Sequence, residues 1–207
     1  MSLSNQPTEH VAQRLLDIQK VLFEFAEIER LIYFPDNKKQ DRFENDAEHS
    51  YSLAMACWHL AHFYPHLDRD KMIRYALVHD FVEIHAGDIQ AIGRTEAQAE
   101  AKAAREHAAL ERIKHEWPDF HELGATIQEY EERDNPESKF VYALDKLMPM
   151  LLNLLSKGKT WKKYDFSSEV VLAAKDEKVV VSPEVQELWQ VYRQQITQHT
   201  DTLFNKG

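Results

Sequence analysis

The sequence predicts an all-α protein, and three observations support this fold class. The chain of 207 residues contains only 5 Gly and 7 Pro, against a share of roughly 12% for these two residues in an average protein. Sandwiches and barrels use Gly and Pro in their many turns, so an all-β fold is disfavoured. Hydrophobic residues make up 43% of the chain, which excludes dominant disorder. Apolar residues also recur every three or four positions, as they do on one face of a helix.

This period indicates three helices in the first part of the chain. A first helix is expected over residues 11–28, and a loop over 33–46, where a proline and a charged run interrupt the pattern. A second helix begins near Asp46 or Ala47, and Asp68 is a suitable N-cap for a third. The apolar faces expected for these helices are Leu15, Ile18, Leu22, Phe25 and Ile28; then Leu53, Ala56 or Cys57, Leu60 and Phe63; then Met72, Ile73, Ala76 and Leu77.

Strong helix formers and proline-containing breaks organise the remainder of the chain. There is no internal repeat and no linker that separates two domains, so residues 1–207 are expected to form a single domain. The expected segments are a helix over 95–117, a helix over 121–133, a helix over 138–156, a loop over 158–168, a short strand or the end of a helix over 178–181, and a last helix from Ser182.

Charge and cysteine content restrict the partners and the compartment. The formal net charge is −10, and a field of this sign repels nucleic-acid polymers and anionic membranes. The only cysteine is Cys57, so an internal disulfide and a cysteine-based metal cluster are excluded, and a reducing compartment is favoured. The polar start of the sequence is unlike a secretory signal, and no apolar run is long enough to span a membrane. We therefore expect a soluble, cytoplasmic protein.

Four polar residues lie where the helical pattern points inward. His49, His79, Asp80 and Asp145 are in register with the apolar residues of their helices. An unpaired buried carboxylate costs several kcal/mol, so the two aspartates need a cation or hydrogen-bond donors nearby. Two imidazoles and two carboxylates are a donor set suited to a divalent transition metal. Four protein ligands also leave room on the ion for water and a substrate oxygen, which is typical of catalytic sites.

Each of these residues also has an ordinary explanation. A single inward histidine is commonly a hydrogen-bonded core residue. The adjacent His79 and Asp80 can cap the end of a helix, and Asp145 can form an ion pair with Lys146. The occurrence of all four at the inner ends of three helices favours a metal centre over four separate coincidences.

The same residues resemble a known family. His49, then His79-Asp80, then Asp145 is similar to the H…HD…D signature of HD-domain metal-dependent phosphohydrolases. RFENDAEHS at 42–50 resembles the R-x-E-N-[hydrophobic]-x-E-H-S segment of the HD-type 5'-deoxynucleotidases, and HDFVEIHAGDI at 79–89 resembles their HD-x-x-E-x-x-x-GD-[hydrophobic] segment. ALDKL at 143–147 is similar to their final aspartate motif.

The resemblance implies a single-domain helical bundle of the HD-domain type. Its motif-bearing core covers about residues 25–155, and a C-terminal helical extension, which matches no motif, covers 156–207. It also implies a homodimer and one divalent ion (Mn, Co, Fe or Zn) held by the four residues named above.

The resemblance further implies roles for residues around the metal. Glu83 lies one helical turn after His79 and would orient or deprotonate the attacking water, and Asp88 would contact the same water or the sugar. Arg30 and Arg94 are candidates for contacting the nucleotide. The alternatives are a surface position for Glu83, an N-cap for Asp88, a solvated helix end for Arg30 and an exposed side chain for Arg94.

The implied function is that of a metal-dependent phosphomonoesterase. It would hydrolyse 5'-deoxynucleoside monophosphates, which are small nucleotide substrates, to deoxynucleoside and phosphate. One alternative keeps the fold and changes the substrate to another nucleotide or phosphate ester. A second alternative is a non-catalytic binding module in which the metal only holds the helices together. The preference for deoxyribose is carried by the family resemblance alone.

Overall fold

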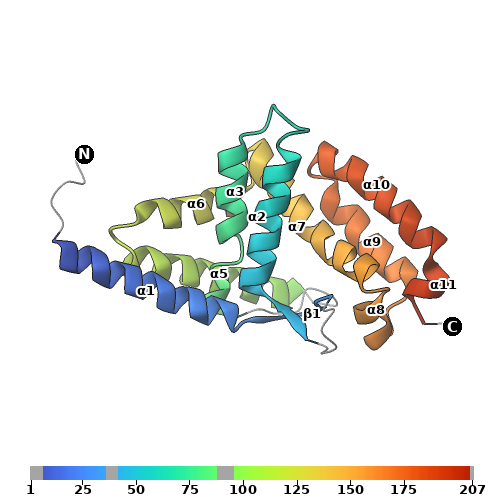
Figure 1. The fold of residues 1–207 in the computed structure, drawn as a ribbon, viewed down its shortest axis with the longest axis horizontal. Coiled ribbons are helices and arrows are strands. Elements are labelled where there is room, and N and C mark those ends of the chain that lie inside the picture. Colours follow the sequence, from blue (N-terminus) through green and yellow to red (C-terminus); the bar gives the residue numbers. More distant parts are fainter. Residues whose placement is uncertain (1–6, 36–41, 88–95, 206–207) are drawn as a thin grey trace.

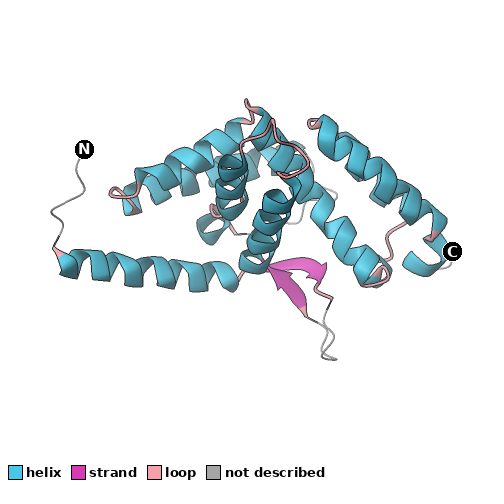
Figure 2. Cartoon of the chain, turned by 45° about the horizontal axis from the view of Figure 1, so that its top comes forward, coloured by secondary structure: helices cyan, strands magenta, loops and turns pink. Residues whose placement is uncertain are grey.

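The described part of the chain folds into helices apart from one small sheet, which confirms the all-α fold class (Figures 1 and 2). The computed structural model describes residues 7–35, 42–87 and 96–205. No helix within these ranges is both long and apolar enough to cross a membrane. The elements are α1 (Thr8–Ala26), β1 (Glu29–Tyr33), β2 (Phe43–Asn45), α2 (Asp46–Leu60), α3 (Arg69–Val78), α4 (Glu83–Ala86), α5 (Glu96–Glu116), α6 (His121–Glu132), α7 (Pro136–Leu155), α8 (Lys159–Lys163), α9 (Ser168–Val179), α10 (Pro183–Gln198) and α11 (Thr200–Leu203).

Helix α7 forms the centre of the main core. It packs against α2 and α3 on one side and against α9 and α10 on the other (Figure 1). Its residues Phe140, Val141, Leu144 and Leu147 are all buried, in one cluster with the fully buried Trp189 of α10. A second, smaller core lies between α5, α6 and the turn that precedes α4. The C-terminal extension therefore shares its core with the motif-bearing helices.

A two-stranded antiparallel sheet corrects the loop expected over 33–46. Glu29 pairs with Asn45 and Tyr33 with Phe43, with an irregular register between them. The rings of Tyr33 and Phe43 stack with their centroids 4.8 Å apart, and cross-strand aromatic pairs of this kind stabilise a sheet. The sheet also ends the first helix at Ala26, ahead of the expected end at residue 28. Propensity within the segment did not indicate these strands, because their stability comes from pairing across the hairpin.

Four residues expected on inward helix faces are exposed, which corrects those predictions. On α1 the inward side consists of Ile18, Val21 and Phe25, which pack on the smaller core. Leu15 and Leu22 lie on the outside, and Leu15 has 62% of its surface exposed. Phe63, after the end of α2, and Leu77, on α3, are exposed as well. A helical period identifies an apolar face but does not show which neighbour covers it.

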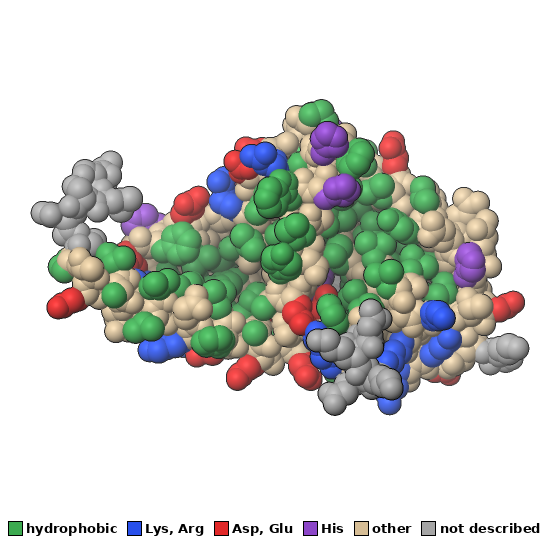
Figure 3. Space-filling view, viewed as in Figure 1, with side chains coloured by type: hydrophobic (Ala, Val, Ile, Leu, Met, Phe, Trp, Pro, Cys, Tyr) green, Lys and Arg blue, Asp and Glu red, His purple; other side chains and the backbone are tan. Residues whose placement is uncertain are grey.

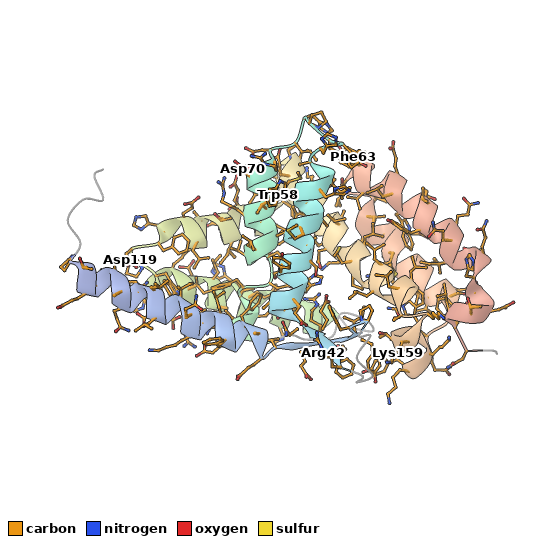
Figure 4. All side chains as sticks on the ribbon, viewed as in Figure 1. Arg42, Trp58, Phe63, Asp70, Asp119 and Lys159 are labelled. Carbon is orange, nitrogen blue, oxygen red and sulfur yellow. The ribbon has the colours of Figure 1, made fainter. Side chains whose placement is uncertain are left out.

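The C-terminal extension contacts the hairpin through α8. This short helix lies in the segment expected to be a loop, and Thr160 Oγ1 accepts a hydrogen bond of 3.0 Å from the Tyr33 backbone N–H. Trp161 stacks flat on Phe204, with ring centroids 4.7 Å apart. Figure 4 shows Lys159 close to the hairpin, and its ammonium lies 5.0 Å from the Tyr33 ring centroid. The segment 178–181, left open as a strand or a helix end, contains the end of α9.

Gly158 is required where α8 meets the end of the chain. It has a φ of +72°, and a Cβ at this position would lie 1.7 Å from the Leu203 carbonyl oxygen. We predict that Gly158→Ala lowers the free energy of unfolding by roughly 2–4 kcal/mol, through backbone strain and overpacking. Denaturant unfolding measures this loss.

Gly124 is the comparison, since its Cβ would lie 2.6 Å from Cγ of the Lys114 side chain, which can shift, whereas the close contact at Gly158 is with backbone. Gly124 lies inside α6, where alanine is the better helix former, and Gly124→Ala should change stability by less than about 1 kcal/mol. Equal effects of the two substitutions would contradict the predicted close contact at Gly158.

Candidate metal centre

The start of α2 is held by a capping box that positions His49 in the second turn. The side chain of Asn45 accepts a 2.9 Å hydrogen bond from the Glu48 N–H, and the Asn45 N–H donates to Glu48 at 3.3 Å. Such reciprocal bonds satisfy two amide groups at a helix start and fix its position. Arg42, labelled in Figure 4, donates to both carboxylate oxygens of Glu48 at 2.7 Å. His49 follows directly and is fully buried.

His79 and Asp80 lie at the end of α3. His79 Nδ1 is 2.9 Å from the Ala76 carbonyl oxygen. A carbonyl only accepts hydrogen bonds, so Nδ1 carries the proton and Nε2 presents a lone pair. This Nε2 is buried and makes no hydrogen bond to the described residues, although it lies 2.9 Å from Asp80 Oδ2. Two acceptor atoms this close together indicate a position that suits a cation.

Asp145 completes the group from the middle of α7. Its carboxylate is buried, with Oδ1 2.9 Å from His49 Nε2 and 3.8 Å from His79 Nε2. The neighbouring Lys146 contacts the other oxygen. One donor atom from each of His49, His79, Asp80 and Asp145 lies within 4.8 Å of the other three. The structure therefore brings together all four residues that the sequence singled out.

The environment keeps both aspartates ionised. Burial alone would raise the pKa of Asp145, but Lys146 and His49 outweigh burial and hold this pKa well below its usual range. Burial would likewise raise the pKa of Asp80, but the positive charges of a protonated His79 and of Arg30 lower it overall. Both groups are therefore carboxylates at neutral pH, which is the form that binds a metal ion.

The donor set fits a single divalent transition metal. Imidazole nitrogens and carboxylate oxygens together suit ions such as Mn, Co, Fe or Zn. Four carboxylates lie around the Arg30 guanidinium, and Lys146 adds a second positive charge, so two negative charges remain when the histidines are neutral. One divalent cation offsets this charge. The four carboxylates belong to Glu44, Asp46, Asp80 and Asp145.

Glu83, the expected base, begins the short helix α4 beside this group. It is buried, and one of its oxygens lies within 4.8 Å of donor atoms of Asp46 and Asp80. Lys102, on α5, reaches to 3.6 Å from Glu83 Oε1. The alternative of a surface position for Glu83 is therefore wrong. Asp88 and Arg94, the other two residues expected near substrate, lie outside the described residues.

Arg30 does not lie at a solvated helix end, which corrects that alternative. It projects from β1 and not from a helix end, and only 17% of its side chain is exposed. Its nitrogens face the carboxylates around the centre. Burial would lower the pKa of Arg30, but Asp80 and Asp145 raise it well above its usual value. The guanidinium is therefore a permanent positive charge inside the centre.

Sequence reasoning missed several residues around the centre. Asp46 is fully buried at the position where the family segment has a hydrophobic residue, and this difference was the signal for it. Glu44 was present in the same segment, and its Oε2 lies 3.2 Å from His49 Nδ1. Lys175, on α9, carried no signal; burial and the charge of Lys146 lower its pKa to about 8. Because Lys175 lies outside the motifs, its position near the centre is seen only once the extension is folded against the core.

Comparisons with known proteins agree with the geometry. A family model described as an HD domain matches residues 35–189. The 5'-deoxynucleotidase HDDC2 of Homo sapiens is 30% identical over 138 residues, which are 66% of this chain and 65% of the relative. The Bos taurus protein of the same name is 29% identical over 136 residues, or 65% of this chain and 63% of the relative. The match thus spans just under two thirds of the length of these relatives.

A solved structure extends the likeness to nearly the whole chain. The crystal structure of a predicted metal-dependent phosphohydrolase from Magnetospirillum magnetotacticum superposes with a TM-score of 0.76 at 27% identity. The superposition covers 94% of this chain and 97% of that one. The similarity therefore includes the C-terminal extension as well as the motif-bearing helices.

Glu44 offers a test of the centre that leaves its four donor residues unchanged. A carboxylate beside His49 Nδ1 favours the tautomer that keeps the proton on Nδ1 and frees Nε2 for a metal. We predict that Glu44→Gln weakens Mn²⁺ binding about 10- to 100-fold, which is the usual effect of losing such an outer partner. Calorimetric titration of the metal-stripped protein measures the change.

Glu48→Gln is the control for the Glu44 substitution, because Glu48 lies four residues along and contacts Arg42 and the helix start. Its Mn²⁺ affinity should stay within about twofold of the unsubstituted protein, since a partly exposed ion pair contributes little. An unchanged affinity in Glu44→Gln would contradict the role of the Glu44 carboxylate as an outer partner of His49.

Proposed function

The chain belongs to the HD domain family, and from this premise we propose that it is a metal-dependent phosphohydrolase. The observation that carries the proposal is the convergence of His49, His79, Asp80 and Asp145 on one buried point. The similar structure from Magnetospirillum magnetotacticum is described as a predicted metal-dependent phosphohydrolase, which supports the same activity. In this proposal the four residues hold one divalent ion.

The substrate class that we propose is 5'-deoxynucleoside monophosphates, with deoxynucleoside and phosphate as products. The support is the name of the curated relatives, 5'-deoxynucleotidase, together with the sequence segments around His49 and His79. A divalent ion supplies Lewis-acid polarisation of a phosphoryl oxygen and lowers the pKa of a water in its coordination sphere. The protein's own side chains would carry out the remaining steps.

Glu83 is the group that we assign to the attacking water. It is buried next to Asp80, and a carboxylate in this position can accept a proton from a water molecule. Lys102 lies 3.6 Å from one of its oxygens and so restricts the side chain to one side of the centre. We assign Asp88 to the water or the sugar and Arg94 to the phosphate, both from the family resemblance.

Two broader features belong to the same proposal. We propose that residues 1–207 act as one domain, because the extension 156–207 shares a core with α2, α3 and α7. We also propose a cytoplasmic enzyme, on the ground that the single cysteine suits a reducing compartment.

The first test is phosphate release from a panel of deoxy- and ribonucleoside monophosphates, with and without Mn²⁺ or Co²⁺. We expect release to require the metal and to be faster with the deoxy substrates. Release from a different phosphate ester alone would replace the substrate class and keep the enzyme class. Absence of release from every substrate, with metal shown to be bound, would contradict the proposed activity.

A second prediction concerns Glu83. We expect Glu83→Gln to reduce kcat by about 10²- to 10⁴-fold, the usual contribution of a general base, with Mn²⁺ still bound. Glu106→Gln is the matched control, because Glu106 also pairs with Lys102 but is not in the donor groups around the centre. Full activity in Glu83→Gln would remove Glu83 from the mechanism.

We also propose that the protein is a homodimer, formed through the exposed apolar surface of α1 and α2. Figure 3 shows hydrophobic side chains gathered over these helices, and Figure 4 places Trp58 and Phe63 on the same side. Contiguous apolar surface of this kind is unusual on a monomer. Its exposed members are Val11, Leu15, Leu16, Leu22, Phe23, Tyr51, Met55, Trp58 and Phe63.

Light scattering during gel filtration tests the dimer. We expect about twice the chain mass of 24.3 kDa, and a shift to the monomer mass in the double variant Leu16→Glu and Phe23→Glu. Val191→Glu alters an exposed apolar residue on α10, which lies on the opposite side of the molecule from α1 (Figure 1), and serves as the control. A monomer mass for the unsubstituted protein would rule this assembly out.

A further inference from the structure

The Arg30 guanidinium lies among the carboxylates of the candidate metal centre. Its Nη1 is 3.0 Å from Asp46 Oδ1 and also contacts Asp80 Oδ2. Its Nε is 3.7 Å from Glu44 Oε2, and its Nη2 is 3.9 Å from Asp145 Oδ1. Every nitrogen of this side chain thus faces a carboxylate within 4 Å. Arginine suits such buried ion pairs, because its guanidinium is always charged and presents several donors in a fixed plane.

The same carboxylates include a second group with the geometry of a metal site. One oxygen from each of Asp46, Asp80 and Glu83 lies within 4.8 Å of the other two. Asp80 belongs to this group and to the first one, so the two groups share a carboxylate. Sites that hold two divalent ions commonly have this arrangement, with the ions about 3.5–4 Å apart.

Arg30 already supplies positive charge to this second group. Its Nη1 connects Asp46 to Asp80. Asp46 has no exposed surface, and a carboxylate in such a place must be neutralised by a nearby cation. Lys102, 3.6 Å from Glu83, lies beside the third member.

We propose that the Arg30 guanidinium takes the place of a second cation and limits the protein to one divalent ion per chain. Arg30 is then a residue that determines metal stoichiometry, and not one that binds the nucleotide. The inference rests on the metal centre of the proposed function, but it does not depend on which substrate is hydrolysed.

Counting bound Mn²⁺ tests the proposal directly. The full chain, Arg30→Gln and Arg30→Lys are stripped of metal, dialysed against excess Mn²⁺ and analysed for metal and protein content. We expect one ion in the unsubstituted chain, two in Arg30→Gln, which loses the charge but keeps a donor for Asp46, and one in Arg30→Lys. Electron paramagnetic resonance should show a spin-coupled Mn²⁺ pair in Arg30→Gln only, because a shared carboxylate couples neighbouring ions.

Two further variants separate this role from a structural one. Arg30→Gln combined with Asp46→Asn removes a donor from the second group and should return the count to one. Arg30→Met also removes the charge and provides a second uncharged variant if glutamine disturbs folding, which circular dichroism monitors. Two ions in the unsubstituted chain, or one or fewer in both uncharged variants, would overturn the proposal.

The metal count also distinguishes this inference from the proposed function. One ion in the unsubstituted chain and two in Arg30→Gln would support the role of Arg30 even if no nucleotide were hydrolysed. Phosphate release by a chain that holds two ions would overturn the inference about Arg30 and keep the proposed activity.

Discussion

The arrangement of α2, α3 and α7 depends on the requirement that each buried carboxylate at their meeting point has a positive or hydrogen-bonding partner. Asp145, inside the otherwise apolar α7, satisfies this requirement through His49 of α2 and through Lys146. Asp80, after α3, satisfies it through Arg30 of the hairpin. These contacts connect elements that are 96 and 50 residues apart in the chain. The packing of these helices and the geometry of the candidate metal centre therefore depend on the same contacts.

The same requirement explains how an acidic protein is suited to phosphate chemistry. A net charge of −10 repels a phosphate group, and the carboxylates of the centre repel it further at short range. Two of these negative charges are left over after Arg30 and Lys146 are counted. In the proposed function this excess holds a divalent ion, and the ion attracts the phosphate. The hairpin and the extension contribute by fixing Arg30, since Thr160 of α8 binds the strand on which Arg30 lies.

Local signals in the sequence predicted most of the helices and the four residues of the centre. Asp68 and Ser182 accept hydrogen bonds at the starts of α3 and α10, as expected for capping side chains. His49 and Asp145 were identified because their polarity contradicts the register of their own helices. The hairpin was missed, because its strands are short and are stabilised by the pairing of Tyr33 with Phe43 and not by propensity. Helix α8 was missed for a similar reason, since Trp161 stacks on a residue near the far end of the chain.

The sequence by itself determined the helical fold class, the helix starts that have capping residues, and the chemical character of the centre. These properties depend on neighbours a few residues apart, where periodicity and capping can be recognised. Only the tertiary structure decided that Arg30 projects from a strand into the centre, that Asp46 and Glu44 are buried around it, and which apolar faces stay exposed. The physical reason is that charge neutralisation and burial depend on contacts between distant segments, and a one-dimensional pattern does not specify which segments meet.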